Sequence, residues 1–303
     1  MTDVQPVHDV AEHPEDQLRF LLDEVAAGRR CALVTIVGIV ERASRNVGTQ
    51  MVVAEDGRYA GSVSSGCIDG SVATFALDAL KVGEPRRVRL GAGSNFIDLQ
   101  LPCGGGVDLL IQPDPDVRAL QSVLDKLDQR ERCTLSLGEF SVNYRPKLRL
   151  ILAGRGSELT VFARLATSSG FDVHAYSPDT VDVETCAAHG ATAARLTSST
   201  AAPEINADTW SAVVTLFHDH DWEPAVLRAA LATDAFYIGA LGSPKTQENR
   251  LLTLRQMGVE DGQRIQGPIG LVPSMRNATM LAISTLAEII DRFHQRHPSP
   301  VAQ

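Results

Sequence analysis

Residues 148–159 have the sequence LRLILAGRGSEL, which indicates the fold of the second half of the chain. The apolar run Leu148–Leu152 predicts a buried strand, and the apolar pattern over Leu159–Ser168 predicts a helix that ends before Gly170. A strand that passes through a glycine loop directly into a helix is the first unit of a Rossmann fold. We therefore expect a Rossmann-like domain to begin here.

The glycine loop matches the dinucleotide-binding fingerprint only in part. Gly154 permits the tight turn, and Gly156, followed by Ser157, lets a backbone approach a pyrophosphate at the helix N-terminus. Leu159 stands at the position of the usual third glycine, and Ser177 ends the next strand, where an acid normally binds the ribose. A serine there leaves room for a 2′-phosphate. The loop thus leaves three possibilities open: NAD(P), another phosphate compound, or no ligand.

Around this unit, strands and helices alternate along the chain. Further strands are expected at 172–176, 212–217 and 235–239, and helices at 180–189, 223–232, 247–257 and 277–293. Alternation of this kind is typical of a doubly wound sheet whose strands are parallel and whose helices cover both faces.

The first half has a different pattern, in which short strands outnumber helices. Helices are expected at 17–27, 68–82 and 116–130, and strands at 31–40, 50–54, 58–63, 87–91, 107–112 and 133–140. The prediction is an α/β chain: a smaller N-terminal α+β domain over 16–143, followed by a Rossmann-like doubly wound parallel-sheet domain over 147–295. A polar linker, Tyr144–Lys147, separates them, and residues 1–15 are expected to be a disordered tail.

Composition limits the classes of function. The 303 residues carry a formal net charge of −9 and no basic run, which argues against nucleic acid as a partner. The five cysteines form no C-x-x-C pair, which favours reduced thiols in the cytoplasm over disulfides or a zinc knuckle. No apolar run reaches the length of a membrane span, and the polar N-terminus does not resemble a signal peptide.

Two of the cysteines lie in glycine-rich loops. Cys67 is in GSVSSGCIDG, residues 61–70, and Cys103 is in LPCGGG, residues 101–106. The other three begin strands or lie in an alanine-rich helix, as inert small hydrophobic residues do. We expect the backbone N–H groups of the two loops to be free, and such a loop at a helix start can favour a thiolate and hold an anion. This combination suits a small molecule that carries both phosphate and a metal.

The second half offers further polar candidates after its strands. His218 and His220 belong to a His-Asp-His segment that follows a strand, at the edge where α/β sheets bind ligands. The segment could shape a cleft, contact an anion, hold a metal or form a hydrogen-bonded turn, and no further metal ligand is visible. Gly242 and Ser243, with Lys245 close by, could form a second phosphate-binding turn at a helix start.

Six segments together resemble the xanthine dehydrogenase accessory family, the XdhC/CoxI-like proteins, over most of the chain. Two of them are the cysteine loops, and a third is the arginine-to-glycine loop that begins at Arg45. The others are residues 217–220 (FHDH), 237–243 (YIGALGS) and 268–271 (PIGL). Each match is weak alone, but all six occur in the order that the family has.

The resemblance implies a maturation chaperone rather than a catalyst. Such proteins bind the molybdenum cofactor, a molybdopterin, keep it ready for sulfuration and deliver it to the large subunit of a molybdenum hydroxylase such as xanthine dehydrogenase. It implies that Cys67 holds the cofactor, with a possible contact to its molybdenum, and that Cys103 supports it. The neighbouring binding candidates are Arg45, Ser65, Gly66 and Gly104. A cysteine desulfurase as a further partner and a homodimer are also expected.

The chain departs from the family pattern at four places. Ser65 replaces a glycine, Ser157 a histidine and Ser177 an acid, and residues 272–275 replace an Asp-Ile-Gly segment. Three of these positions lie in the second domain and bear on its ligand. Two alternatives therefore stay open: an NAD(P)-dependent oxidoreductase that uses the Rossmann domain, although it lacks a recognisable catalytic dyad, and an interaction protein with a degenerate site.

Overall fold

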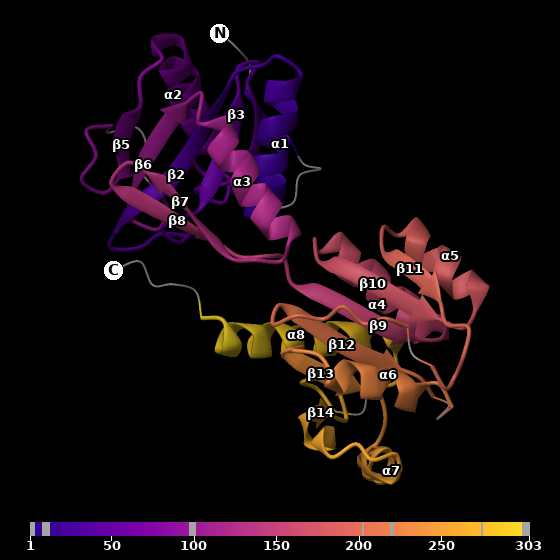
Figure 1. Cartoon of the computed structure of the whole chain (residues 1–303). Coiled ribbons are helices and arrows are strands. Elements are labelled where there is room, and N and C mark those ends of the chain that lie inside the picture. Colours follow the sequence, from indigo (N-terminus) through magenta and orange to yellow (C-terminus); the bar gives the residue numbers. More distant parts are fainter. Residues whose placement is uncertain are drawn as a thin grey trace. The chain divides into compact units, whose positions relative to one another are not determined.

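The computed structural model describes residues 4–7, 13–96, 101–201, 203–218, 221–273 and 275–298 (Figure 1). The chain divides into two compact units, Met1–Pro146 and Lys147–Val301, called unit 1 and unit 2 below. Each contains a large sheet of its own. Among the helices in the described ranges, none combines the length and the apolar character needed to cross a bilayer.

Unit 1 contains sheet A, in which the described strands have the order β1-β4-β3-β2-β6-β5. The edge pair β1–β4 is parallel, and the other neighbours are antiparallel. The strands are β1 (Gln5–Pro6), β2 (Cys31–Val40), β3 (Gln50–Ala54), β4 (Arg58–Gly61), β5 (Arg86–Gly91) and β6 (Gly106–Pro113). The helices are α1 (Pro14–Ala26), α2 (Asp69–Val82) and α3 (Val117–Asp128).

The alternation of side chains along β2 explains why helices cover both faces of sheet A. Ala32, Val34 and Ile36 pack into an apolar cluster with α2, whereas Cys31 and Leu33 pack into a second cluster with α1 and α3. A strand that is buried on both faces has a continuous apolar sequence rather than an alternating one. This is why the run CALVTIVGIV identifies its strand so clearly.

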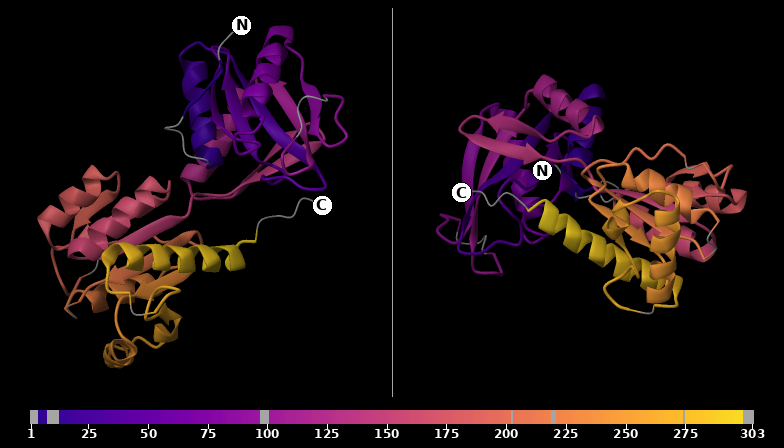
Figure 2. Two further views of the ribbon diagram at one scale, coloured as in Figure 1. Left: turned by 180° about the vertical axis from the view of Figure 1, so that it is seen from behind. Right: turned by 60° about the horizontal axis from the view of Figure 1, so that its bottom comes forward.

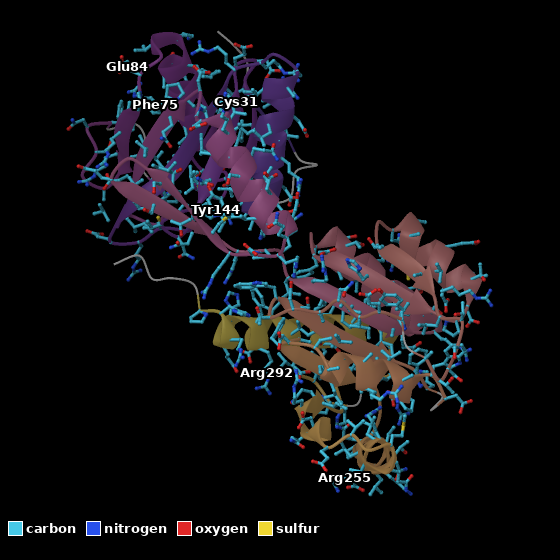
Figure 3. The ribbon with its side chains drawn as sticks, in the orientation of Figure 1. Cys31, Phe75, Glu84, Tyr144, Arg255 and Arg292 are labelled. Atoms are coloured by element: carbon cyan, nitrogen blue, oxygen red, sulfur yellow. The ribbon has the colours of Figure 1, made fainter. Side chains whose placement is uncertain are left out.

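The segment after α3 is a hairpin rather than the single strand expected over 133–140. Strands β7 (Cys133–Leu137) and β8 (Phe140–Tyr144) pair antiparallel around Gly138, whose φ of +69° suits a tight turn. Tyr144, assigned to the linker from the sequence, ends β8. This residue, labelled in Figure 3, is buried. Its hydroxyl donates a hydrogen bond of 2.7 Å to Gln50 Oε1. A turn of only two residues hid the hairpin in the sequence.

Unit 2 contains sheet C, whose described strands are all parallel and have the order β11-β10-β9-β12-β13-β14. Numbered within the unit, this order is 3-2-1-4-5-6, which is that of the Rossmann fold. The strands are β9 (Arg149–Gly154), β10 (Asp172–Ser177), β11 (Thr192–Arg195), β12 (Ser211–Leu216), β13 (Tyr237–Ala240) and β14 (Ile265–Gln266). The predicted fold class, an α+β unit followed by a doubly wound parallel sheet, is confirmed.

Helices cover both faces of sheet C. On one face, α4, α5 and α8 pack with Leu150 and Leu152 of β9, and on the other, α6 and α7 pack with Ile151 and Ala153. Figure 2 shows α8 in yellow along its face of the sheet. The two cores follow from the alternation of side chains along β9. The helices are α4 (Gly156–Ser168), α5 (Thr180–Ala188), α6 (Glu223–Leu231), α7 (Pro244–Gln256) and α8 (Ala278–Arg296), with a 3₁₀ turn at Asp261–Arg264.

The sequence prediction misses the shortest elements. Residues 1–15 are expected to be a disordered tail, but Gln5–Pro6 pairs with β4, and α1 begins at Pro14. Strands β11 and β14 are also missing from the prediction, because one is a largely exposed edge strand and the other has two residues. Helix α7 begins three residues early, since Ser243 caps it and Pro244 takes the first helical position.

A buried ion pair joins α6 to α7. Arg250 Nε and Nη2 donate to the two carboxylate oxygens of Glu223 at 2.8 and 3.0 Å, and each side chain is 3% exposed. Glu223 also accepts a hydrogen bond of 2.9 Å from Thr215 Oγ1, and Arg250 donates to Leu241 O and to Gln247. The pair therefore has the further hydrogen bonds that buried charges require.

We expect Arg250→Met to lower the free energy of unfolding of unit 2 by about 3–5 kcal/mol, because it leaves the Glu223 carboxylate buried without a counter-charge. Urea unfolding followed by circular dichroism measures the change. Arg255→Met, at an exposed position in the last turn of the same helix, is the control and should change it by less than about 0.5 kcal/mol. Small effects of both variants would contradict the role of the pair.

Candidate functional site

Three loops of unit 1 leave the same end of sheet A. Gly61, the last residue of β4, pairs with Met51 near the start of β3. Gly106, the first residue of β6, pairs with Val40 at the end of β2 and with Gly91 at the end of β5. The loops that follow β2 and β4 and the loop that precedes β6 therefore extend from one edge. They carry Arg45, Cys67 and Cys103 respectively.

These three loops share an apolar base. Val63 and Ile68 from the Cys67 loop, Leu101 from the Cys103 loop, and Ala43 and Val47 from the Arg45 loop all belong to the cluster that packs on α2. Both thiols are exposed to solvent. The edge therefore presents two accessible thiols on a packed support.

The loop that carries Cys67 is organised by the carboxylate of Asp69, in the first turn of α2. Asp69 is 3% exposed. Its oxygens accept hydrogen bonds from the N–H groups of Val63 (3.1 Å) and Gly66 (2.9 Å) and from the hydroxyls of Ser62 (2.6 Å) and Ser64 (2.7 Å). Four donors satisfy a buried carboxylate. The sequence prediction misses Asp69, although serines followed by an acid in the first helical turn are a capping pattern that could have revealed it.

The expectation that the N–H groups of this loop are free is wrong. The N–H of Ser65 donates to Ser62 Oγ at 2.8 Å, and that of Ile68 donates to Ser64 Oγ at 2.9 Å. Ser65 and Gly66 have φ angles of +58° and +97°. The left-handed conformation costs a residue with a Cβ about 1 kcal/mol, so these hydrogen bonds hold a strained turn in place. The loop is a preformed support for the thiol rather than an open anion nest.

Cys103 lies in a tight turn that packs against the end of β2. The N–H of Gly104 donates to Leu101 O at 2.9 Å, and Cys103 Sγ lies 3.8 Å from the carbonyl oxygen of Arg42, as a weak donor. A Cβ on Gly105 would collide with the backbone of Arg42. Gly105 is therefore needed because two backbones approach closely here. The run of three glycines in the sequence does not reveal that the second backbone is that of Arg42.

The loop after β2 supplies positive charge to this edge. Arg42 is exposed and Arg45 is half-buried. The loop folds back on β2 through a hydrogen bond of 2.8 Å from the N–H of Gly48 to Ile36 O. A guanidinium group on this loop, at the same edge of the sheet as the two thiols, can contact an anionic group of a bound molecule.

The other three cysteines are packing residues. Burial raises the pKa of the Cys31 thiol to about 12 and that of the Cys186 thiol to about 11, and it also raises the pKa of Cys133. Because the thiolate is the reactive form, these groups react slowly near neutral pH.

In unit 2, the two glycines of the loop after β9 have different structural roles. A Cβ on Gly154 would lie 2.6 Å from Leu216 Cβ, so glycine lets β9 and β12 approach. Gly156 has a φ of +65° and open space at the Cβ position. Its N–H donates to Asp182 Oδ2 at 2.8 Å, and the same oxygen accepts a hydrogen bond of 3.0 Å from Ser177 Oγ. Gly156 and Ser177, two of the residues predicted to meet a nucleotide, thus both contact Asp182.

Ser157 and His218 are both near Glu158, in the first turn of α4. Ser157 Oγ donates to Glu158 Oε2 at 3.0 Å, and His218 Nε2 lies 3.6 Å from Glu158 Oε1. His220 lies outside the described residues. Within the ranges that the structure describes, no group of three or more His, Cys, Asp and Glu side chains is arranged to hold a metal ion.

The turn before α7 is a helix cap. Ser243 Oγ accepts the N–H of Thr246 at 3.1 Å, and the two hydroxyl oxygens lie 2.9 Å apart. Gly242 has a φ of +150°, and a Cβ there would lie 2.8 Å from Thr246 Cγ2. The side chain of Ser243 thus already satisfies one of the N–H groups that a phosphate would need.

The predicted residues fall into one group in each unit. In unit 1, the loops of one edge of sheet A carry Arg45, Ser65, Gly66, Cys67, Cys103 and Gly104. In unit 2, the ends of β9, β10, β12 and β13 carry Gly154, Gly156, Ser157, Ser177, His218, Gly242 and Ser243. This second edge is the carboxyl edge of a parallel sheet, where Rossmann folds bind their ligands.

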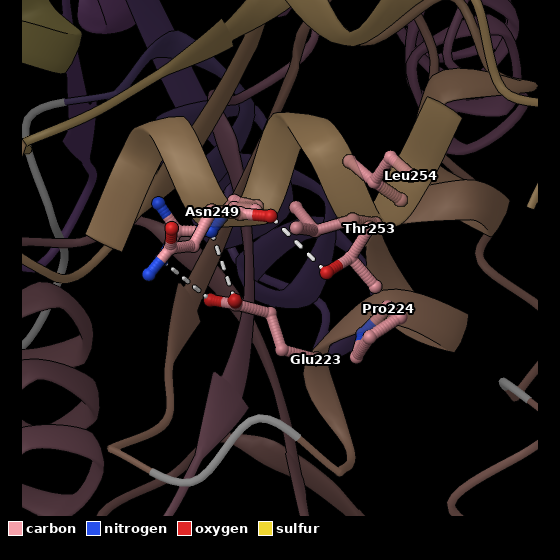
Figure 4. Close-up of a pocket in the computed structure, with 7 residues that line it drawn as sticks. Glu223, Pro224, Asn249, Thr253 and Leu254 are labelled. Carbon is pink, nitrogen blue, oxygen red and sulfur yellow. Dashed lines mark hydrogen bonds and ion pairs between the residues drawn. The ribbon is translucent and has the colours of Figure 1, made fainter. Parts of the chain in front are cut away.

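A pocket of about 150 Å³ lies elsewhere, between α6 and α7 (Figure 4). It is lined by Glu223, Pro224, Leu227, Asn249, Arg250, Thr253 and Leu254. Its two charged side chains pair with each other, so neither is available to a ligand. None of the residues predicted from the sequence lines it.

Comparisons with known proteins agree with this architecture. The profile of the XdhC Rossmann domain matches residues 150–289, and that of the XdhC and CoxI family matches residues 24–91. The molybdenum cofactor insertion chaperone PaoD of Escherichia coli (strain K12) is 36% identical over 305 residues, which cover 93% of this chain and 90% of PaoD. This chain belongs to the XdhC and CoxI family. The resemblance inferred from six short segments is thus confirmed.

Two further likenesses extend the comparison. The uncharacterized protein YqeB of E. coli (strain K12) is 24% identical to this XdhC-type chain over 251 residues, which cover 80% of the chain and 40% of YqeB. The crystal structure of a Bacillus halodurans protein described as a xanthine dehydrogenase matches with a TM-score of 0.77, over 94% of this chain and 98% of that one. At 19% identity, this last match shows the fold alone.

Iodoacetamide should modify Cys67 and Cys103 of the native chain before Cys31 and Cys186, at rates that differ by at least about tenfold. The first pair is exposed, whereas the second is buried with a raised pKa. Peptide mass spectrometry over a time course near neutral pH measures the four rates. The difference should vanish in concentrated urea, and equal rates in the native chain would contradict the placement of the thiols.

Asp69→Ala should lower the free energy of unfolding of unit 1 by about 3 kcal/mol, because charge-assisted hydrogen bonds are lost and their donors stay partly buried. Hydrogen exchange followed by mass spectrometry should show faster exchange in residues 62–68. Asp78→Ala is the control, since it removes an exposed acid of the same helix that pairs with Lys81 at 3.1 Å. Unchanged exchange in the Asp69 variant would show that the loop does not depend on this acid.

Proposed function

We propose that this XdhC-type chain is a maturation chaperone that binds the molybdenum cofactor as its cargo and delivers it, after sulfuration, to the large subunit of a molybdenum hydroxylase such as xanthine dehydrogenase. The observation that carries the proposal is the 36% identity, over 93% of the chain, with a molybdenum cofactor insertion chaperone. Cys67 and Cys103, on loops that leave the same edge of sheet A, are the groups that suit such a cargo.

The residues of this edge fit a cargo that combines a metal with phosphate. A thiolate is a soft metal ligand, and the guanidinium groups of Arg42 and Arg45 suit phosphate. Because Asp69 already holds the loop in shape, Cys67 needs little ordering to meet the cargo, and preorganisation of this kind favours affinity.

A binding role is proposed rather than a catalytic one. Within the described residues, no histidine or carboxylate is hydrogen-bonded to Cys67 or Cys103, and the Cys103 thiol instead faces a backbone carbonyl. A nucleophilic cysteine is normally activated by such a base. The two thiols therefore suit the holding of a ligand.

The finer parts of the proposal concern partners. Sulfuration needs a sulfur donor, for which we propose a cysteine desulfurase, and we propose that the chain acts as a homodimer in the cytoplasm.

The alternative function, an NAD(P)-dependent oxidoreductase, is favoured by the strand order of sheet C and by the glycine loop at its carboxyl edge. The contacts of Asp182 with that loop speak against it.

The chain purified from cells that make the cofactor should release a pterin that mass spectrometry detects. Cys67→Ala should lower the ratio of pterin to protein by at least about tenfold, equivalent to about 1.4 kcal/mol of binding free energy. Cys133→Ala, which changes a packing cysteine, should retain the ratio. The loaded chain should also activate a cofactor-free hydroxylase.

The other possible results would count against the role of Cys67 or in favour of one of the two alternative functions. An unchanged ratio in Cys67→Ala would refute the role of this thiol. Capture of a hydroxylase large subunit without pterin in any preparation would favour the pure interaction protein. A saturable fluorescence change on titration with NADPH would support the oxidoreductase.

A further inference from the structure

The phosphate-facing part of the Rossmann loop in unit 2 is already in contact with an anion of the chain itself. Asp182, in the first turn of α5, places Oδ2 at 2.8 Å from the N–H of Gly156 and at 3.0 Å from Ser177 Oγ. Ser177 ends β10 and is fully buried. The carboxylate thus accepts hydrogen bonds from both positions at which this fold normally contacts a nucleotide.

In a Rossmann domain, the N–H groups at the start of the first helix receive a pyrophosphate, and the end of the second strand contacts the ribose. Gly156 begins α4, and Ser177 is the last residue of β10. A carboxylate meets the same requirements as a phosphate oxygen here, because it is an anionic acceptor at the positive end of a helix. We propose that Asp182 occupies the phosphate position of this loop and thereby keeps unit 2 from binding a nucleoside diphosphate or dinucleotide.

The charges around the loop support the same conclusion. The first turn of α4 carries Glu158, and the N-cap of α5 is Asp179. The guanidinium of Arg155 lies 3.3 Å from Asp179 Oδ2 and over the ring of Trp222, at 5.6 Å from its centre. His218 faces Glu158. The guanidinium of Arg155 within the loop is thus paired with a carboxylate, and an incoming pyrophosphate would meet several negative charges.

Asp182 also accounts for a departure of this sequence from the dinucleotide-binding pattern. The acid that would contact a ribose is absent at position 177, and the serine there donates its hydroxyl to Asp182 instead. The hydrogen bond between Ser177 and Asp182 therefore accompanies both the missing ribose contact and the occupied phosphate position. The inference concerns unit 2 alone and does not depend on the proposed function.

Isothermal titration of the full chain with ADP, and separately with NADPH, tests the proposal. The variants are Asp182→Ala and Asp182→Ser, of which the second retains a polar side chain in the first turn of α5. Glu184→Ala is the matched control, because it removes one exposed acid from the same helix and leaves the contacts of Asp182 intact. Circular dichroism establishes that each variant is folded.

The wild-type chain and Glu184→Ala should show no saturable binding, whereas at least one Asp182 variant should bind ADP at least about tenfold more tightly than the wild type. Amide exchange of Gly156 should be slow in the wild type, fast in the Asp182 variants, and slow again when ADP is added to them. Saturable binding of ADP or NADPH by the wild type with an affinity equal to that of the variants would overturn the proposal. Failure of both folded Asp182 variants to exceed the control would overturn it as well.

Discussion

The buried carboxylate of Asp69 is the contact on which the functional edge of unit 1 depends, because it joins the loop after β4 to the first turn of α2. The same kind of contact recurs in unit 2. Asp182 on α5 accepts the N–H of Gly156, and Glu288 on α8 accepts the N–H of Gly270 at 2.6 Å. In each case an acid on a helix satisfies a glycine N–H that a phosphate could otherwise bind.

Because of these contacts, the glycine loops of this chain are not evidence of anion-binding sites. A loop rich in glycine suggests an anion site because its N–H groups are accessible. Here the chain, whose net charge is −9, supplies the anions from its own acidic side chains. Recognition of an anionic cargo then rests on other groups at the edge of sheet A, namely Cys67, Cys103 and the guanidinium groups of Arg42 and Arg45. The glycine loops position these groups rather than bind the cargo through their backbone.

Long apolar runs made most of the fold predictable. The runs at 31–40 and 148–154 are buried on both faces of their sheets, so hydrophobicity alone identifies them. The missed elements lack that signal. Strand β1 has two exposed residues, and its existence depends on pairing with β4, more than fifty positions later. The β7–β8 hairpin turns within two residues, so its two strands form one continuous β-rich segment in the sequence.

In the candidate site, too, some features follow from the local sequence and others depend on strands that are distant in the sequence. Exposure of Cys67 and Cys103 follows from their glycine-rich surroundings, which a strand or helix interior would not contain. Their presence at one edge of sheet A depends on the register of four neighbouring strands, which no local pattern reveals.

The same holds for the acids that accept the glycine N–H groups, because the sequence predicts an acid only when it lies close to its glycine along the chain. Gly66 and its acid are three positions apart, whereas Gly156 and Asp182 are 26 apart and Gly270 and Glu288 are 18 apart. Only the first of these pairs lies within one capping motif. A glycine loop in a sequence therefore establishes that backbone N–H groups are available for a partner, but whether that partner is a ligand or an acid of the same chain is decided by tertiary packing.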